Sequence, residues 1–494
     1  MFRLKRFPSG LLRKVKARFC ARGDLQDDVD VFDTYAPVAS WSSIRMLTVT
    51  AMQKGWITRQ IDFSNAFVQA PMSRDVYVSL PAMFADSNSI ESKLLCLKLR
   101  KRLYGLKDAP KLWHDWLAKG LSKAQFTPSD SDPGIYFGRG MCLVVYVDDV
   151  LLFGPNEEDM EKVISELQLD GFDLKLEKTG AEKAYDFLGI HITEEIDAET
   201  NSKVIKMTQL GLIKKFLECV QMVDCNPSPT PCTVQPLGTD ANGKRFSETW
   251  EYASAVGMLM YLAGNAYPEI QYAVHQCARF THAPRQSHAV AVKRIAHYLK
   301  GVLDQEGGLC YKVSSDLNFD MYCDADYAGL WTYEDDQDPV CVRSRTGYVM
   351  TLGGCPVHWT SKLQTEIALS TLEAEYIALA QGMREFVHLR RFYVEMLLNF
   401  DIFKDSQSIV KSKIFEDNNG CISTATAPKL TPRTKHISVK YHFVRNYFNL
   451  DPQKKTIHPF ILEKIASEEQ KADLFTKGFN PETFLRLRKL LFKW

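Results

Sequence analysis

The chain has 494 residues, 45% of them hydrophobic and 11% aromatic, which suits roughly two to four well-packed globular domains. Its 61 basic and 60 acidic side chains leave a formal net charge of +1, so any electrostatic sign of a partner must be local. No uninterrupted apolar run approaches the ~18 residues of a membrane span. The 12 cysteines form no CxxC pair, which favours free thiols in a reducing compartment over a disulfide framework.

The most basic stretch is the N-terminus, where residues 1–18 contain seven Lys or Arg and no acid. From Lys14 to Phe19 the basic residues alternate with apolar ones, which is the two-residue period of a strand with one basic face. FRLKRF, PSG and LLRKVKARF therefore predict a strand, a turn and a second strand. A targeting segment and an ordinary solvated strand face are the alternatives.

Hydrophobic periodicity predicts the remaining elements. In the first half, residues 41–55 and 111–124 have helical patterns, and residues 56–63, 75–80 and 141–153 have extended ones. Residues 225–247 hold four Pro and two Gly and predict a linker. Beyond it we expect helices at 252–264, 270–280 and 287–299, strands at 308–313, 318–323 and 347–352, a helix at 373–398 and a strand at 412–416. Strands followed by helices, twice over, indicate two α/β-type catalytic modules joined by a helical connector.

At residues 141–154 the sequence MCLVVYVDDVLLFG places two apolar runs around the adjacent acids Asp148 and Asp149. The runs predict a buried hairpin with both acids at its tip. Turn chemistry does not explain the pair, because the favoured hairpin turns use Asn-Gly or Asp-Gly, and neighbouring carboxylates repel unless a cation lies between them. An acidic, solvent-facing turn is the alternative.

A third acid, Asp62, closes the apolar strand at residues 56–63. Mg²⁺ prefers oxygen ligands and usually binds one or two carboxylates together with substrate phosphates. Two such ions roughly 3.5–4 Å apart can activate a hydroxyl and stabilise a leaving phosphate oxygen. From residue types alone, Asp62, Asp148 and Asp149 fit nucleotidyl transfer.

The second half contains four separated acids in similar settings. Asp324 ends an apolar run, Glu375 lies on a helical pattern, Asp417 follows a strand-like segment, and Asp473 lies in EEQKADLF. If they converge, they suit a two-metal site for phosphodiester cleavage. Their spacing does not show convergence, and each acid taken alone also fits an ordinary surface charge.

The box Tyr146-Val147-Asp148-Asp149 resembles the catalytic box of reverse transcriptases, and the blocks around it resemble the copia type of long-terminal-repeat retrotransposon. The matching blocks, all in family order, are KARFCARGDLQ, TYAPVASWSSIR, QIDFSNAFVQAP, LRKRLYGLKDAPKLWHDWL, YDFLGIHI, VGMLMYLAG, HAVAVKRIAHYLKG, YCDADYAG, SRTGYVMTLGGCPVHWTSKLQ, ALSTLEAEYIALA, DNNGC, RTKHISVKYHF and KADLFTKGF. A single YxDD box can arise by chance, whereas an ordered series of blocks along nearly the whole chain does not.

The resemblance implies an α+β polymerase right hand of fingers, palm and thumb, followed by a helical connector and an α/β ribonuclease H-like domain. It places the reverse transcriptase fingers and palm at residues 1–225, the linker and helical thumb or connection region at 226–305, the ribonuclease H-like domain at 306–480 and a C-terminal tail at 481–494. The sequence starts at Met1 just before the finger hairpin, without the protease and integrase blocks of the family. We therefore expect a processed-like fragment, a truncated gene model or an element remnant.

The resemblance also implies roles for single residues of the polymerase. Asp62, Asp148 and Asp149 match the carboxylates that hold two Mg²⁺ ions, with Mn²⁺ as an alternative ion. Phe67 matches the position whose ring excludes a ribose 2′-OH, although an ordinary core Phe also fits. Lys16, Arg18 and Arg22 match the finger strand that contacts the incoming triphosphate, and Tyr146 belongs to the catalytic box. Tyr104, Gly105 and Lys107 match the loop that lines the nucleotide pocket, where the glycine lets the backbone approach the substrate. A solvated loop lysine is the alternative for Lys107.

In the second module, Asp324, Glu375, Asp417 and Asp473 match the metal-binding carboxylates of ribonuclease H, again with two Mg²⁺ ions. Asp326 and Glu373 are expected to be bystanders or supporting residues. His436 belongs to a block typical of the copia ribonuclease H domain and receives no firm role.

The implied function is an RNA-directed DNA polymerase with ribonuclease H activity, which copies retrotransposon RNA into DNA and degrades the RNA of the hybrid. The expected partners are an RNA template, a DNA primer, the RNA–DNA hybrid and deoxynucleoside triphosphates, with other polyprotein products such as integrase as further candidates and no membrane. The expected location is a cytoplasmic virus-like particle, with a later nuclear stage. The alternatives are an inactive element remnant and a host-retained nucleic-acid-binding protein; the latter predicts lost carboxylates or a disrupted YVDD box, and neither is seen.

Overall fold

A computed structural model describes the chain at residues 2–6, 12–26, 34–72, 74–80, 95–176, 184–197, 201–312, 316–331, 340–402, 411–430, 434–448 and 459–492. The chain divides into two compact units. The first comprises Met1–Ser40 and Gly55–Lys178, and the second comprises Trp41–Lys54 and Thr179–Trp494.

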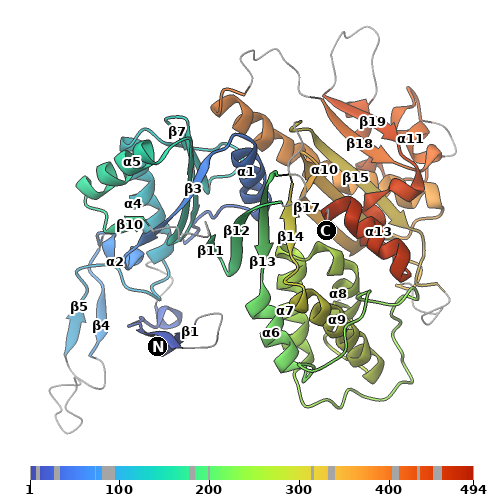
Figure 1. Cartoon of the computed structure of the whole chain (residues 1–494), viewed down its shortest axis with the longest axis horizontal. Coiled ribbons are helices and arrows are strands. Elements are labelled where there is room, and N and C mark those ends of the chain that lie inside the picture. Colours follow the sequence, from blue (N-terminus) through green and yellow to red (C-terminus); the bar gives the residue numbers. More distant parts are fainter. Residues whose placement is uncertain are drawn as a thin grey trace. The chain divides into compact units, whose positions relative to one another are not determined.

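The first unit is built on a six-stranded antiparallel sheet (Figure 1). Its strands, in spatial order, are β10 (Leu174–Leu176), β3 (Ile57–Phe63), β9 (Asp149–Gly154), β8 (Met141–Tyr146), β7 (Ile135–Gly138) and β6 (Thr127–Pro128). Helices α4 (Ala109–Lys123) and α5 (Glu157–Leu169) share one hydrophobic core with this sheet. The smaller elements are β1 (Phe2–Arg6), β2 (Leu12–Ala17), η1 (Gly23–Leu25), α2 (Ala66–Gln69), β4 (Tyr77–Ser79) and β5 (Cys96–Lys98).

The alternation of side chains along the strands decides which face of the sheet the helices cover. Leu143 and Val145 of β8 and Ile61 and Phe63 of β3 all lie in the core shared with α4 and α5. Successive side chains of a strand point to opposite faces. Asp62, which lies between Ile61 and Phe63, therefore belongs to the face of the sheet away from the helices.

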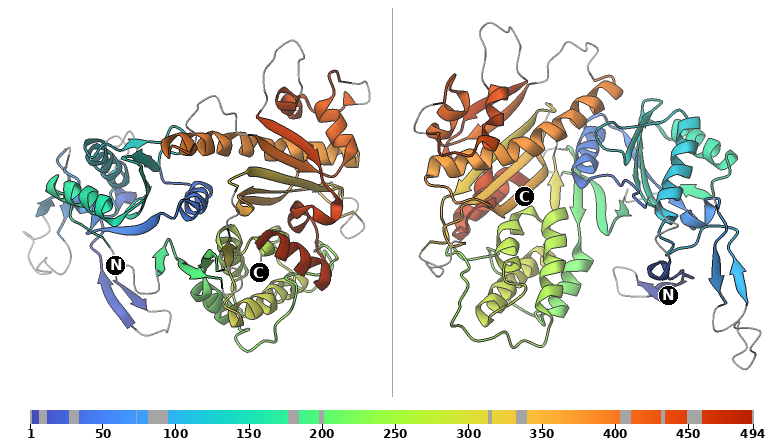
Figure 2. Two further views of the ribbon diagram at one scale, coloured as in Figure 1. Left: turned by 45° about the horizontal axis from the view of Figure 1, so that its top comes forward. Right: turned by 180° about the vertical axis from the view of Figure 1, so that it is seen from behind.

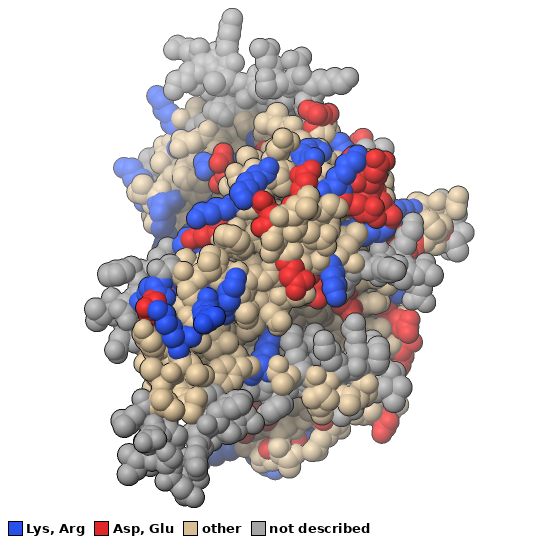
Figure 3. Space-filling view, turned by 90° about the vertical axis from the view of Figure 1, so that its left-hand side faces the viewer, with Lys and Arg blue, Asp and Glu red and all other residues tan. Residues whose placement is uncertain are grey.

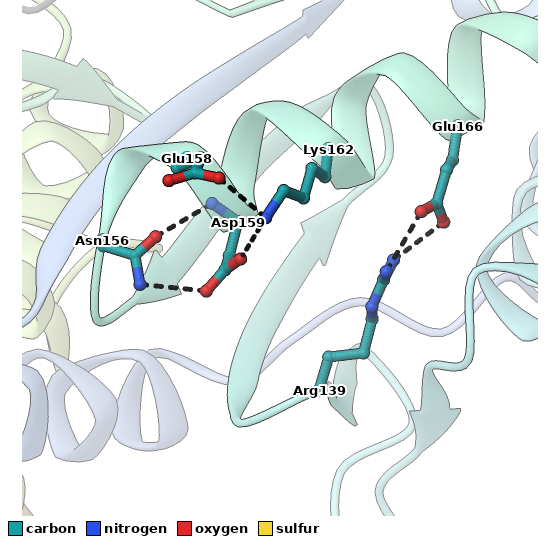
Figure 4. A network of polar contacts seen from close by, with 6 residues as sticks. All are labelled: Arg139, Asn156, Glu158, Asp159, Lys162 and Glu166. Carbon is teal, nitrogen blue, oxygen red and sulfur yellow. Dashed lines mark hydrogen bonds and ion pairs between the residues drawn. The ribbon is translucent and has the colours of Figure 1, made fainter.

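A polar network fixes α5 to the turn between β7 and β8 (Figure 4). The side chain of Asn156 caps the helix by accepting a hydrogen bond from the backbone N of Asp159 at 2.9 Å, and Lys162 pairs with Asp159 at 3.1 Å. Arg139, in the turn, donates to both carboxylate oxygens of Glu166 at 2.8 and 3.0 Å. The first contacts stabilise the start of α5, and the Arg139–Glu166 pair joins its second half to the β7–β8 turn.

The second unit contains two sheets. The first is antiparallel, in the order β11 (Ala184–Phe187), β12 (Ile190–Ile196), β13 (Lys203–Thr208) and β14 (Leu309–Tyr311). The second has the order β17 (Cys355–Leu363), β16 (Arg345–Leu352), β15 (Phe319–Asp326), β18 (Ser412–Glu416) and β19 (Phe460–Lys464). In it β17, β16 and β15 are antiparallel, whereas β15, β18 and β19 are parallel.

Helices complete the second unit. The longest, α10 (Thr371–Asn399), lies along the five-stranded sheet against β15 and β16 (Figure 2). A helical cluster contains α6 (Leu210–Cys219), α7 (Tyr252–Asn265), η3 (Pro268–Ile270), α8 (Gln271–Ala278) and α9 (Gln286–Asp304). The remaining elements are α11 (Asn419–Thr426), η5 (Val439–Val444), α12 (Arg445–Phe448), η6 (Ser467–Glu469), η7 (Lys471–Phe475) and α13 (Pro481–Phe492).

Helix α1 (Trp41–Gln53) belongs to the second unit although the chain on both sides of it belongs to the first. It packs against β17 and α10. Arg45 of α1 is 3% exposed and donates hydrogen bonds to the carbonyl oxygens of Val357 at 3.2 Å and Gly264 at 2.6 Å. Its guanidinium lies 4.0 Å from the ring centroid of Trp359, and burial lowers the pKa of Arg45 to about 10. The helix is therefore an integral part of the second unit.

The predicted linker at residues 225–247 has neither helix nor strand, as its prolines indicate, but it is not a free tether. It is bonded along α9. Arg294 donates to the hydroxyl of Thr230 at 2.9 Å, and a ring nitrogen of His288 bonds with the carbonyl of Gly238 at 3.0 Å. The prediction that residues 225–247 form a linker is therefore corrected, because they are an irregular segment bonded to α9 within the second unit.

Most predicted helices and strands are confirmed with boundaries shifted by one to three residues. The N-terminal strands are confirmed as β1 and β2, while the predicted turn at residues 8–10 lies outside the described residues. Residues 481–492 of the predicted tail form α13, which buries Phe484, Leu487 and Leu491. The compact units divide after residue 178, and the predicted domain boundary at residue 225 stays a prediction. The physical reason for the division after residue 178 is that β13 pairs with β14, which lies beyond the connector.

Among the helices that the structure describes, none is both long and apolar enough to cross a membrane. On the face drawn in Figure 3, basic and acidic side chains are interspersed, as the near-zero net charge leads one to expect. The chemistry of the protein must therefore be sought in local clusters of charge.

Candidate functional site

Asp62 and Asp149 are directly opposed in the sheet of the first unit. They lie on neighbouring antiparallel strands, and such partners lie on one face with Cβ atoms about 4.5–5.5 Å apart. Tyr146 is the partner of Asp149 at the end of the β8–β9 hairpin, so the turn itself consists of Val147 and Asp148. The prediction that both acids lie at the tip is thus wrong for Asp149, which is the first residue of β9.

The turn that carries Asp148 has an uncommon backbone conformation. Val147 has a φ of 60°, in the left-handed region where a β-branched residue is strained. Its carbonyl accepts a hydrogen bond from Nε1 of Trp113 on α4 at 2.7 Å. Trp113 is itself buried against Phe63, with ring centroids 5.2 Å apart. The core of the first unit therefore over-determines the position of the turn, which is how such strain persists.

Three predicted substrate-binding side chains gather beside Asp148. The Arg18 guanidinium lies 4.0 Å from the Asp148 carboxylate and 4.8 Å from the ring centroid of Tyr104. The ring of Phe67, on α2, lies 4.8 Å from the same tyrosine ring. Burial and the Asp148 and Asp62 charges raise the pKa of Tyr104. The structure thus brings Arg18 and Tyr104 close to Asp148, and Phe67 into contact with Tyr104.

The loop at residues 104–107 packs on the segment that follows β2. Gly105 has a φ of 93°, and a Cβ on it would lie 2.1 Å from the carbonyl oxygen of Ala21. A Cβ on Gly23 would lie 1.9 Å from the carbonyl oxygen of Gly105. The glycine therefore allows a close approach between two backbone segments of the protein, and the predicted approach of its backbone to substrate stays a prediction. Lys107 donates from Nζ to the carbonyl of Gln26 at 2.8 Å, which joins the same two segments.

The structure places the other predicted basic residues differently. Arg22 pairs with Asp24 at 2.6 Å, and both side chains are mostly exposed. Lys16 lies on β2 opposite Arg3, and its side chain lies outside the part that the structure describes. Of the predicted finger cations, Arg18 is therefore the one seen beside the acids.

In the second unit, parallel pairing brings two predicted acids to one edge of the five-stranded sheet. Tyr322 on β15 is the partner of Phe415 on β18. Asp324 and Asp417 each lie two residues further along, so they stand level at the carboxyl ends of neighbouring strands. Strand ends of this kind are where α/β sheets usually carry their sites.

Glu375 reaches the same edge from the first turns of α10. Ser370 caps this helix by accepting a hydrogen bond from the backbone N of Glu373 at 3.2 Å, and the helix packs on β15. Oxygens of Asp324, Glu375 and Asp417 all lie within 4.8 Å of one another. Glu373 accepts a hydrogen bond from Leu369 N at 2.7 Å, at the start of α10, so its role as a bystander or a supporting residue stays a prediction.

The chemistry of this cluster fits a hard divalent cation. Burial, followed by the Asp324 charge, raises the pKa of Glu375 to about 11. Its Oε2 is buried and has no hydrogen-bond partner. A buried carboxylate oxygen without a donor, beside two more carboxylates, matches the oxygen ligands that Mg²⁺ and Mn²⁺ prefer. Asp62, Asp148 and Asp149 of the first unit are adjacent but do not form so tight a group among the described residues.

Asp473 approaches Asp324 from η7, on the other side of the cluster. Gly347 on β16 is the cross-strand partner of Asp324. A Cβ on Gly347 would lie 2.6 Å from Cγ2 of Thr476, so the missing side chain lets this segment pack against the strand. Thr476 donates a hydrogen bond from its hydroxyl to Asp324. Burial and the Asp324 charge raise the pKa of Asp473 to about 8.

Sequence reasoning missed two charged residues at this cluster, Glu416 and Lys477. Glu416 is fully buried and accepts hydrogen bonds from Sγ of Cys323 at 3.3 Å and from the backbone N of Asn418 at 3.1 Å. Burial raises the pKa of Glu416 to about 8. Lys477 pairs with Asp473 at 2.9 Å. The available signals were a carboxylate inside the strand-like KSKIFE and the spacing of four residues between Asp473 and Lys477.

Comparisons with known proteins identify the family to which the chain is similar. A family model described as reverse transcriptase (RNA-dependent DNA polymerase) matches residues 4–234. The chain is 32% identical over 489 residues to the retrovirus-related Pol polyprotein from transposon RE1 of Arabidopsis thaliana. It is 31% identical over 492 residues to the Pol polyprotein from transposon TNT 1-94 of Nicotiana tabacum. These matches cover 98% and 97% of the chain but 31% and 34% of the relatives, so the chain spans about a third of their length.

Proposed function

The chain belongs to the copia-type retrotransposon Pol proteins and carries their reverse transcriptase domain, and we propose that it copies RNA into DNA and degrades the RNA strand of the resulting hybrid. The observation that carries the polymerase proposal is the register that sets Asp62 opposite Asp149, next to the rigid turn at Asp148. The convergence of Asp324, Glu375 and Asp417 supports the nuclease proposal.

In the proposed polymerase, Asp62, Asp148 and Asp149 hold divalent cations, with Mg²⁺ as the expected ion. Two such cations supply activation of the primer 3′-hydroxyl and stabilisation of the leaving phosphate oxygen. The protein contributes by positioning. Arg18, 4.0 Å from Asp148, can bind the incoming triphosphate. The neighbouring rings of Phe67 and Tyr104 can pack against the sugar of the nucleotide. Catalysis then rests on orientation and charge stabilisation, and no side chain needs to carry a proton.

In the proposed ribonuclease H centre, Asp324 lies between Glu375 and Asp417 on one side and Asp473 on the other. The mixed sheet with α10 along it is the α/β arrangement expected of such a domain. The 2′-OH and the shape of the hybrid distinguish its RNA strand from DNA. Template and primer bind mainly through their phosphates, so binding should weaken steeply as salt rises.

Primer extension on a poly(rA) template with an oligo(dT) primer and Mg²⁺ tests the polymerase. Asp148→Asn should abolish extension, while Asp170→Asn, at an exposed acid paired with Lys123, should keep it. Absence of extension by the unaltered chain, or equal extension by Asp148→Asn, would refute the polymerase proposal. Each active-centre variant should leave the other activity unchanged, which controls for folding.

Cleavage of the RNA strand in a labelled hybrid tests the nuclease. Asp324→Asn should abolish cleavage and retain extension. Hybrid cleavage that survives this change would show that the assigned acids are not the nuclease centre.

A further inference from the structure

A lysine ammonium lies inside the acidic cluster of the second unit. Nζ of Lys477 is 2.9 Å from Oδ1 of Asp473 and 3.9 Å from Oδ2 of Asp324. The carboxylates are 11% and 4% exposed, whereas the lysine side chain is 43% exposed. The lysine therefore reaches from the surface between two buried acids.

Asp324 divides the cluster into two sides. On one side lie Glu375 and Asp417, whose oxygens are within 4.8 Å of those of Asp324. On the other side lie Asp473 and the ammonium of Lys477. Among the described residues, no basic side chain pairs with the carboxylates of the first side. The second side already contains a cation, the Lys477 ammonium.

The lysine is held in place by the backbone and is not the end of a free loop. Its N–H donates to the carbonyl of Asp473 at 3.3 Å, within the turn that ends η7. The neighbouring Thr476 donates to Asp324, and Gly347 allows this segment to pack against β16. The ammonium therefore stays near the two carboxylates without help from substrate.

We propose that Lys477 is a resident cation of the nuclease centre, which occupies the Asp324–Asp473 side and limits the substrate-free protein to one divalent ion, bound by Asp324, Glu375 and Asp417. This inference rests on the proposed nuclease function. An ammonium is a cation without a lone pair, so it neutralises the two carboxylates, repels a second cation and fills the space between their oxygens. A second ion must therefore displace the lysine. The phosphate of a bound RNA strand makes this exchange favourable, because its oxygens bind the incoming metal ion and also pair with the displaced ammonium.

Counting Mn²⁺ ions on the full-length chain tests the proposal. The polymerase acids are first removed with Asp62→Asn, Asp148→Asn and Asp149→Asn, so that bound Mn²⁺ reports the second unit. The triple variant serves as the background, and Lys477→Met or Lys477→Gln is added to it. Electron paramagnetic resonance of the free Mn²⁺ then gives the number of ions that each protein binds. Lys471→Met is the matched control, because Lys471 begins η7, the short helix that ends just before Lys477, and contacts the Tyr322 hydroxyl at 3.2 Å.

We expect the background and Lys471→Met to bind about one ion and both Lys477 variants to bind about two, with Asp473→Asn returning them to about one. About two ions on the background, or no gain in either folded Lys477 variant, would overturn the proposal. Asp417→Asn separates this result from the underlying function, since it should remove the first ion. If Asp417→Asn leaves Mn²⁺ binding unchanged, the proposed nuclease centre itself is wrong, whatever the Lys477 variants do.

Discussion

Replacing Trp113 with Phe tests whether the core of the first unit fixes the turn that carries Asp148. Trp113 is 1% exposed, and its Nε1 donates to the carbonyl of Val147 at 2.7 Å. Phenylalanine keeps an aromatic ring against Phe63 but removes the donor. The change therefore acts on the turn that carries Asp148 without touching any acid.

The size of the effect follows from two costs. A buried carbonyl that loses its donor is destabilised by about 1–3 kcal/mol, and the left-handed conformation of Val147 already costs about 1–3 kcal/mol. Both costs favour relaxation of the turn once the hydrogen bond is gone. If the change shifts the equilibrium between the observed turn and a relaxed one by about 1.4 kcal/mol, the population of the observed turn falls about tenfold. The kcat of primer extension should then fall by the same factor.

Trp116→Phe is the matched control for this experiment. Trp116 lies on the same helix and packs on Phe172 with ring centroids 5.7 Å apart, but its buried Nε1 has no hydrogen-bond partner. It loses the same atoms without losing a bond, so we expect its kcat to stay near that of the unaltered chain. Equal kcat for the two folded variants, checked by thermal melting, would refute the reasoning.

Three further predictions concern the second unit. Gly347→Ala places a Cβ 2.6 Å from Thr476 and should displace the segment that carries Asp473, so hybrid cleavage falls and primer extension is retained; unchanged cleavage would contradict this. Arg45→Met leaves three backbone carbonyls without their donor and should destabilise the unit by about 2–4 kcal/mol in chemical denaturation, and an unchanged midpoint would count against it. Burial and the charge of Asp324 raise the pKa of Glu375 from 4.5 to about 11, so the folded, metal-free chain holds a proton that the unfolded chain has lost at pH 8. The free energy of unfolding of the metal-free chain should therefore fall as pH rises between these two values. At pH 8, Mn²⁺ binding should release about one proton, which calorimetry in buffers of different ionisation enthalpy measures. Binding without proton release would disprove this.

The strands around Asp62, Asp148 and Asp149 could be predicted because their apolar patterns are local. The register of the hairpin could not. YVDD can turn at Val147-Asp148 or at Asp148-Asp149, and the choice depends on a hydrogen bond from Trp113, 34 residues earlier in the chain. The YVDD sequence by itself does not show that Val147 adopts a left-handed conformation or that the indole of Trp113 bonds to it.

The acids of the proposed nuclease centre illustrate a second limit. The sequence shows that Asp324 and Asp417 follow apolar, strand-like runs, but not that β15 and β18 are neighbours, because two strands and a long helix intervene. The family resemblance supplied that expectation. Lys477 escaped notice because a lysine four residues after an aspartate is common on helix surfaces, and only the tertiary packing at Gly347 turns this pair inward.

Helix α1 makes the two units inseparable at the level of the gene. The covalent path passes between the units at residues 40–41, at 54–55 and again at 178–179, so no single cut in the chain yields two complete units. A coding sequence divided after residue 178 would send α1, with Arg45, into the wrong half. Recombination that exchanges the second unit for another must therefore replace fourteen codons within the first as well, and elements of this kind should inherit the two units as one cassette.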